Sequence, residues 1–526
     1  MESIKLWARN GAAVRQAIEL GELAHIETAS EELTDEFLLF AIESGLLQSW
    51  AGSFPDPRCE PEIAMEVILP AHLAARFAGL YSMRKAGYVL RSARILGALG
   101  YSVEVIDPAH GLSLRGTSDD KLFSGDVVRK LLVQMEQHAD LSQPARRPPP
   151  EPSVAVKVRE RASRRAVKHA VDEAEAEARA HKVAEPLVRW YNQHVGVSML
   201  KYARLGRGRR IHILDTTHVE VPIETGTYEC SGVVKNQDGT LSRGYKLATL
   251  RTLLDSAGLL TQVAMSAIQG HDMALCRPLL AEAPVLRAGD LLLEDRGFLD
   301  GATLSALKHK RQVDVILPLK ANMLATQEAI HLAAMADKWQ AHPTRADQTI
   351  ALVRGVAHRW TECAVPLNAC VIRFWNKKKK CTDHLVLITT DLKLNAPWIV
   401  RHDEERPEIE QDYEQMKSGG WQLQKLSSTR YSEIVLYVLT VVVSYSLYHL
   451  FANTQAGARC ADKTRQAIAF EQLRTQRTHI IVYAGGYFEI FETLRFVQIV
   501  LQLSLPVQEH LRAWLAEHLS QIQKRE

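Results

Sequence analysis

The sequence feature that most constrains the fold is a short apolar run that ends in two acidic residues. Residues 291–293 are all leucine, and Glu294 and Asp295 follow them directly. An uninterrupted apolar run of this length is typical of a strand buried on both faces, as in a sheet that helices cover on either side. Ligands bind such open α/β sheets at the carboxyl ends of their strands, so Asp295 is expected at a functional edge.

A second acidic residue, Asp215, has the same setting, because it follows the apolar pair Ile213 and Leu214. A single Asp after a strand is more often a turn residue or a helix cap, so these two acids do not identify a site by themselves. Their surroundings do indicate a fold class. Strand-like runs come first and then alternate with helix-like runs, which predicts an α/β protein with a sheet of mixed direction. The expected strands are 211–214, 245–254, 259–267, 290–293 and 313–317.

A third acidic residue, Glu410, lies in a segment that Pro407 is expected to open as a helix. At about 100° per residue, Arg406, Glu410, Tyr413 and Lys417 share one narrow stripe of that helix. A surface helix also carries Arg, Glu and Lys at these spacings as ordinary ion pairs, so periodicity alone leaves that interpretation open.

Together, the three acidic segments resemble the insertion-sequence DDE transposases of bacteria. Arg406, Glu410 and Lys417 match three positions of the Tyr-Arg-Glu-Lys signature of that family. Residues 294–298 resemble the motif around its second Asp, residues 212–217 resemble the strand of its first Asp, and residues 270–272 are also similar to family sequences. The likeness spans about residues 210–451. It departs from the family at Asp403, where the signature has tyrosine, and at Pro407, where tryptophan is common.

The resemblance implies a ribonuclease-H-like mixed-sheet core with a β-rich insertion, flanked by helical N-terminal and C-terminal regions. It implies that Asp215, Asp295 and Glu410 are catalytic and hold two Mg²⁺ ions, for which Mn²⁺ substitutes. It also implies contacts with DNA. The expected DNA-binding residues are Arg406, Lys417, Arg296, Tyr413 and Trp375, the last as a platform beside Lys377–Lys380 on which a flipped base stacks, although a core tryptophan is the simpler interpretation of Trp375.

The implied activity is cut-and-paste transposition, in which the protein cleaves phosphodiester bonds at transposon ends and joins the 3′-hydroxyl ends to target DNA. The expected partners are double-stranded terminal inverted repeats, target DNA and a second copy of the chain in a homodimer on DNA. Two alternatives stay open. One is an inactive, domesticated transposase that only binds DNA, and the other is a metal-dependent nuclease of the same fold.

Composition and motifs outside the core suggest a division into six segments. They are 1–141 (helical, DNA-end-binding, with 73–81 and 86–99 as a candidate helix-turn-helix), 142–205 (proline-rich basic linker and charged helix), 206–319 (first part of the core), 320–398 (β insertion), 399–455 (second part of the core) and 456–526 (helical, with an apolar stripe suited to dimerisation). Prolines in residues 142–152 exclude a helix there and favour an extended linker.

The compartment is indicated by cysteine usage and hydropathy. Seven cysteines without a CxxC pair favour a reducing cytosol and do not suggest a zinc site or a disulfide framework. The N-terminus lacks the long apolar run of a signal peptide. Residues 434–451 carry no formal charge and reach membrane-spanning length, but their tyrosines, serines and histidine favour a buried helix. We therefore expect a soluble bacterial protein in the cytoplasm, at the nucleoid DNA and without a membrane partner.

Overall fold

The computed structural model describes most of the chain in two compact units. One unit comprises residues 1–47, 60–127 and 451–526, and the other comprises 48–59 and 128–450. The residues described are 8–30, 33–59, 61, 63–88, 93–100, 123, 125–138, 178–203, 208–224, 228–236, 238–254, 258–356, 360–418, 420–454, 457 and 478–513. The proline-rich linker and most of the charged helix expected after it lie outside these residues.

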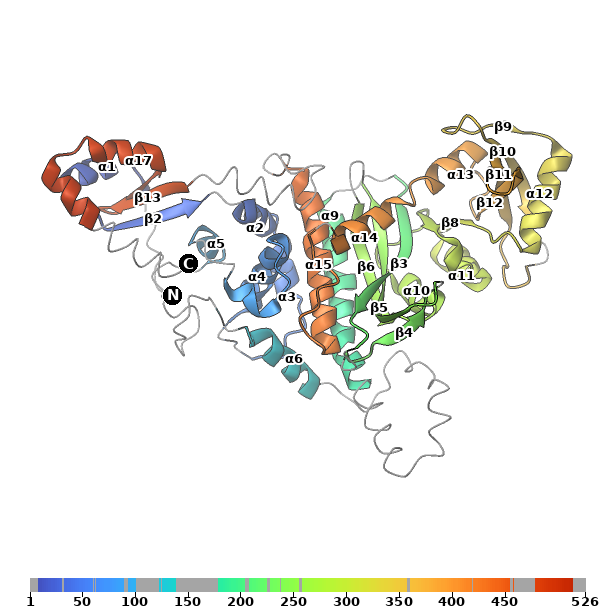
Figure 1. Ribbon diagram of the computed structural model, residues 1–526, viewed down its shortest axis with the longest axis horizontal. Helices are drawn as coiled ribbons and strands as arrows, with labels where there is room; N and C mark the ends of the chain where they lie inside the picture. The colour runs from blue at the N-terminus through green and yellow to red at the C-terminus, as the bar shows by residue number, and fades with distance from the viewer. Residues whose placement is uncertain are drawn as a thin grey trace, which may run out of the picture. The chain divides into compact units, whose positions relative to one another are not determined.

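The larger unit is built on a sheet that contains the expected strands. β3 (Ile211–Val221), β5 (Leu241–Leu253) and β6 (Gly258–Ala267) pair antiparallel, with β5 between the other two. β7 (Leu291–Glu294) and β8 (Asp314–Pro318) then continue the sheet from β3 as parallel strands. The short β4 (Gly232–Lys235) pairs with the start of β5. The chain is therefore a mixed α/β protein with a large mixed sheet (Figure 1).

The segment expected as a β insertion lengthens this same sheet. β12 (Cys381–Thr389) pairs antiparallel with β8, and β11 (Leu367–Asn376), β10 (Thr349–Val356) and β9 (Gln340–Ala341) follow in order. Ten strands therefore form one continuous sheet among the described residues. The segment also contains a helix that the sequence interpretation did not single out, α12 (Leu324–Ala336), which packs against β10, β11 and β12.

Helices lie on both faces of the core strands. On one face, α14 (Glu408–Ser418) contacts β3, and on the other, α10 (Asp272–Glu282) contacts β5 and β6. Further helical segments of this unit are residues 178–190, η2 (Tyr191–Val195), α9 (Gly196–Tyr202), η3 (Arg296–Phe298), α11 (Gly301–Ala306), η4 (Leu307–Arg311), α13 (Ala396–Asp403) and most of α15.

The uncharged stretch noted in the sequence forms α15 (Tyr431–Ala452). Among the described residues it is the one helix long and apolar enough to cross a membrane, and 94% of its most apolar window is buried within the protein. The sequence-based prediction of a buried helix agrees with this burial.

The smaller unit joins the two ends of the chain in a four-stranded sheet. Its order is β1 (Ala8–Arg9), β14 (Tyr487–Glu492), β13 (Thr478–Ala484) and β2 (His25–Ser30). α1 (Gly11–Leu20) and α17 (Thr493–Leu501) pack on it around a core that includes Val14, Ile18, Val482 and Phe496. The other helices of this unit are α2 (Leu33–Glu43), α4 (Met65–Phe77), η1 (Met83–Tyr88) and α5 (Ala93–Ala98). All but the first residue of α6 (Val127–His138) and all but the first two residues of α3 (Leu46–Gly52) belong to the larger unit.

This sheet corrects the prediction of a helical C-terminal region and adds two short strands to a mostly helical N-terminal region. The apolar stripe expected on a C-terminal helix comprises Phe488, Phe491, Leu494, Val497 and Leu501. The last three of these residues lie in α17 and the first two in the strand β14. The reason is the turn before them, where Gly485 and Gly486 both adopt positive φ and so permit a tight hairpin that joins β13 to β14. The candidate helix-turn-helix is also corrected in its described part, because α4 ends at Phe77 and the 3-10 segment η1 and the six-residue α5 follow. Residues 89–92 of the second candidate helix lie outside the described residues.

Candidate active site

The register of β3 and β7 brings the first two acidic residues to one edge of the sheet. The parallel pairing of these strands ends with Leu214 opposite Glu294. Asp215 is the next residue of β3, and Asp295 is the next residue after β7. Two residues that follow paired positions of adjacent parallel strands lie side by side, although Asp215 continues in β3 and pairs with Thr249 on β5. Asp295 is therefore at the carboxyl end of a buried strand, as the leucine run predicted, and the four residues of β7 are all buried.

Arg406 connects the third acidic residue to this edge. Its Nη1 lies 3.3 Å from Oε1 of Glu410 and 3.8 Å from Oδ1 of Asp295. Oε1 of Glu410 and Oδ1 of Asp295 therefore lie no further apart than the sum of these two distances. Its Nε also lies 4.0 Å from Oδ1 of Asp403, the residue at the signature tyrosine position. Pro407 precedes the first residue of α14, so the helix begins where the sequence predicted.

Tyr413 fastens α14 to the strands beneath it. Its hydroxyl donates to the backbone oxygen of Asp215 at 2.8 Å and lies 2.7 Å from Oγ1 of Thr249 on β5. The ring is buried, with 5% of the residue exposed. The DNA contact expected of Tyr413 stays a prediction, and in this structure its ring faces the sheet and is buried. The helical stripe predicted from periodicity did not distinguish a side chain that faces the sheet from one that faces solvent.

A buried charge network also holds α14, and the sequence interpretation missed it. Arg251 on β5 donates from Nε to Asp412 and from Nη1 to Glu408, at 2.7 Å in both cases. The hydroxyl of Tyr445 on α15 donates to the other oxygen of Asp412 at 2.8 Å. Arg251 and Asp412 are both nearly inaccessible to solvent. The signal that could have revealed this network is a charged Arg251 within a run expected to be a buried strand, since a buried charge needs a partner.

The electrostatics agree with three acids close together. The pKa of Asp215 is raised to about 7, chiefly by burial, and the negative charges of Asp295 and Glu410 contribute to this rise. The backbone N–H of Thr216, 2.7 Å from Oδ1 of Asp215, and the Arg406 guanidinium oppose this rise. Burial also raises the pKa of Asp403 to about 6, against the influence of Arg406. Negative charges that raise the pKa of Asp215 in this way would be offset by a cation bound at this edge.

The donor set suits a hard divalent cation, because carboxylate oxygens are the ligands that Mg²⁺ prefers. As the side chains stand, however, no three His, Cys, Asp or Glu residues in the described part of the chain are arranged to hold a metal ion. Arg406 lies between Asp295 and Glu410 and takes up their charge. The predicted metal pair therefore stays a prediction.

The other expected DNA contacts differ in exposure. Arg296, directly after Asp295, is exposed and forms no ion pair or hydrogen bond with another described residue. Lys417 is half-buried, and burial lowers its pKa while Glu220 opposes the change. Trp375 is 59% exposed on β11, beside the basic turn at its end, so the core interpretation of this tryptophan is wrong. These three side chains are accessible in a way that Tyr413 is not.

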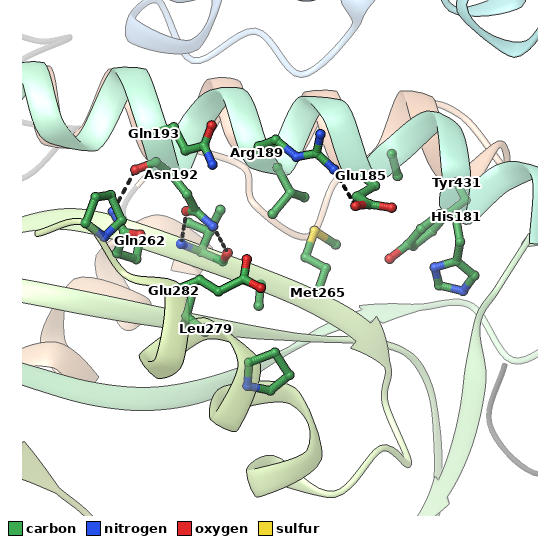
Figure 2. A pocket seen from close by; sticks show the side chains of 16 residues that line it. His181, Glu185, Arg189, Asn192, Gln193, Gln262, Met265, Leu279, Glu282 and Tyr431 are labelled. Atoms are coloured by element: carbon green, nitrogen blue, oxygen red, sulfur yellow. Dashed lines mark hydrogen bonds and ion pairs between the residues drawn. The ribbon is translucent and has the colours of Figure 1, made fainter. Parts of the chain in front are cut away.

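A cavity of about 370 Å³ lies away from the acids, between residues 181–193, β6 and α10 (Figure 2). Asn192 occupies the edge of β6 beside it, since its side chain donates to Val263 O at 2.9 Å and accepts from Val263 N at 2.7 Å. Gln262 donates to the backbone oxygen of Asn192 at 2.9 Å, and Glu185 pairs with Arg189. None of the predicted site residues lines this cavity, whose polar lining is largely bonded within the protein.

Comparison with known proteins leaves the family open. No protein-family model matches the chain, and no curated protein matches it.

Proposed function

We propose that this chain is a DNA transposase of the DDE type, in which Asp215, Asp295 and Glu410 form the catalytic site. One observation carries the proposal. The three acids come from sequence motifs as much as 195 positions apart. Arg406 nevertheless lies within ion-pair distance of both Asp295 and Glu410, and the charges of these two acids contribute to the raised pKa of Asp215. The alternative interpretation, a surface helix with ordinary ion pairs, accounts for the pair between Arg406 and Glu410 within one helix. It does not account for the pair between Arg406 and Asp295, which lies on a different element.

The strand order supports the ribonuclease-H-like core that the motifs imply. Three antiparallel strands, β6, β5 and β3, are continued by the parallel strands β7 and β8. The first acid lies on β3, at the centre of this arrangement, and the second follows β7. The third comes from a helix packed on the same sheet. The proposal requires the three acids to lie on these three elements of such a sheet.

Each residue of the site has a defined task in this proposal. Divalent cations held by the three carboxylates would supply an activated nucleophilic oxygen and a stabilised leaving oxygen. Arg406, no longer needed to neutralise Asp295 and Glu410, would turn its planar guanidinium to phosphate oxygens beside the scissile bond. Arg296 and Lys417 would hold neighbouring phosphates and set the position of the DNA without reading its sequence. Trp375 would stack on an unpaired base.

The test uses a plasmid that carries the gene with several hundred base pairs of its natural flanks on each side. The purified full chain is incubated with this plasmid and an unrelated target plasmid in Mg²⁺, and the products are separated on gels and sequenced. We expect free 3′ ends at the outer boundaries of the element, together with joined products in the target. Cleavage without joining would instead favour a nuclease, and retarded but intact DNA would favour a binding protein.

Three single variants serve as matched controls. Asp215→Asn, Asp295→Asn and Glu410→Gln keep the side-chain volume and remove the negative charge. Each is expected to lower cleavage by at least about a thousandfold, because metal-ligand carboxylates act as a unit. DNA joining that persists at the wild-type rate in all three variants would overturn the proposal. Short inverted repeats in the flanking DNA would support it independently.

A further inference from the structure

A second polar cluster lies against the opposite face of β3, directly behind the acids. Lys246 on β5 donates from Nζ to Oδ1 of Asp272 at 2.7 Å and to the backbone oxygen of Gly270 at 2.6 Å. The hydroxyl of Thr216 donates to the same oxygen of Asp272 at 3.1 Å. Lys246 is nearly inaccessible to solvent, and the side chain of Asp272 is about one-third exposed. The Gly-His-Asp motif of the sequence thus meets β3 one residue after Asp215.

This cluster is bonded to β3 and faces the segment that follows β7. Thr216 bonds Asp272 through its hydroxyl, while its backbone N–H donates to Oδ1 of Asp215 at 2.7 Å. The second oxygen of Asp272 faces the turn after β7, since a Cβ placed on Gly297 would lie 3.9 Å from it. Consecutive residues of a strand point to opposite faces, so Thr216 links the rear cluster to the front face through the backbone.

The nearly buried ammonium of Lys246 explains why this arrangement is fixed. A charge withdrawn from water must be matched by an opposite charge and by hydrogen-bond acceptors. Asp272 supplies the charge, and Gly270 supplies a backbone acceptor, which holds residues 270–272 against β5. His271 caps α10 by accepting from Met273 N at 3.2 Å, and this fixes the next residue at the start of the helix. The position of Asp272 is therefore determined from three sides.

We propose that Lys246, Asp272 and Thr216 are positioning residues for the metal-binding carboxylates. The Lys246–Asp272 pair holds Thr216, and Thr216 orients the Asp215 carboxylate towards the edge where Asp295 and Glu410 lie. This inference rests on the proposed function, because it concerns the alignment of the same three acids. Groups that orient metal ligands from behind change metal affinity by roughly tenfold to a hundredfold when they are removed.

The experiment measures Mn²⁺ binding to the full chain by isothermal titration calorimetry, with no DNA present, and DNA cleavage separately. The variants are Lys246→Met, Asp272→Asn, Thr216→Val and the conservative Thr216→Ser, with Asp238→Asn as control. Asp238 is an exposed turn residue that bonds only to Thr240 among the interactions described for it. We expect Mn²⁺ affinity to fall roughly tenfold or more for Lys246→Met, Asp272→Asn and Thr216→Val. Thr216→Ser and Asp238→Asn are expected to bind as the wild type does.

A double-variant cycle tests whether the residues act together. In the Lys246→Met background, Asp272→Asn is expected to cause little further loss of Mn²⁺ affinity, since the pair has already been broken. A lower melting temperature with unchanged Mn²⁺ affinity would reduce the cluster to a structural role and overturn this inference alone. By contrast, wild-type Mn²⁺ affinity in Asp215→Asn would overturn the proposed function itself.

Discussion

Asp215→Asn should stabilise the metal-free protein while it abolishes DNA cleavage. The pKa of Asp215 is raised from 3.8 to about 7, chiefly by burial and then by Asp295 and Glu410. In the unfolded chain this carboxyl ionises near its ordinary value, so it binds fewer protons than the folded protein does between these two pH values. Ionisation of Asp215 therefore does not lower the free energy of unfolding of the wild type below pH 3.8. It lowers this free energy progressively as the pH rises from 3.8 to about 7.

The size of the effect follows from the shift. About three pKa units at 1.36 kcal/mol each amount to about 4 kcal/mol above pH 7, as an upper limit. Because the residue is only partly withdrawn from solvent, and because asparagine forms its own imperfect contacts, we expect a gain of about 2 kcal/mol at pH 8. The gain should shrink at pH 5 and vanish below pH 4, since the wild-type carboxyl is then neutral in both states.

Urea denaturation followed by tryptophan fluorescence measures this difference, in EDTA and in Mg²⁺. Bound Mg²⁺ stabilises the wild type in proportion to the logarithm of its concentration relative to Kd, so the advantage of the variant should decline as Mg²⁺ is added. Asp238→Asn, at an exposed turn, should give no gain at any pH. An Asp215→Asn variant no more stable than wild type at pH 8 in EDTA would refute the electrostatic reasoning.

Three further predictions concern other parts of the larger unit. Glu294→Gln should raise the unfolding free energy at pH 8 by up to about 4 kcal/mol and leave it unchanged at pH 4, because burial raises the pKa of Glu294 from 4.5 to about 8. Urea denaturation at the two pH values tests this difference. Arg251→Met should cost about 3–5 kcal/mol by leaving Asp412 buried without its partner, and a double variant with Asp412→Asn should recover part of the loss in the same assay. Trp375→Ala should leave the unfolding free energy within about 0.5 kcal/mol of wild type, since the ring is exposed, yet lower strand joining roughly tenfold, whereas Trp375→Phe should retain joining. Equal joining by Trp375→Ala and wild type would exclude the stacking role.

Much of the sheet and the place of the acids could be predicted from local patterns. The leucine run before Glu294 predicted a strand covered on both faces, and the four residues of β7 are all buried. The same reasoning placed Asp215 and Asp295 at strand positions that turn out to be adjacent. Local hydrophobic patterns succeed here because the period of a strand and its burial are written in consecutive residues.

The tertiary structure alone decided the features that depend on distant partners. Tyr413 shares its helical stripe with Glu410, but the Thr249 hydroxyl and the Asp215 carbonyl beneath it turn its ring into the protein. β2 and β13 pair although some 450 residues separate them in the chain, as do β8 and β12 across the insertion. Backbone pairing of this kind leaves little trace in either segment, because any extended strand offers the same donors and acceptors.

The sequence by itself therefore determined which residue types could carry metal chemistry and on which kinds of element they lie. It could not determine that Arg406 reaches Asp295 or that Lys246 and Asp272 lie behind Asp215. Those contacts depend on the direction in which each side chain leaves its element and on what packs against it. Both are set by the burial of the whole sheet rather than by any one segment of the chain.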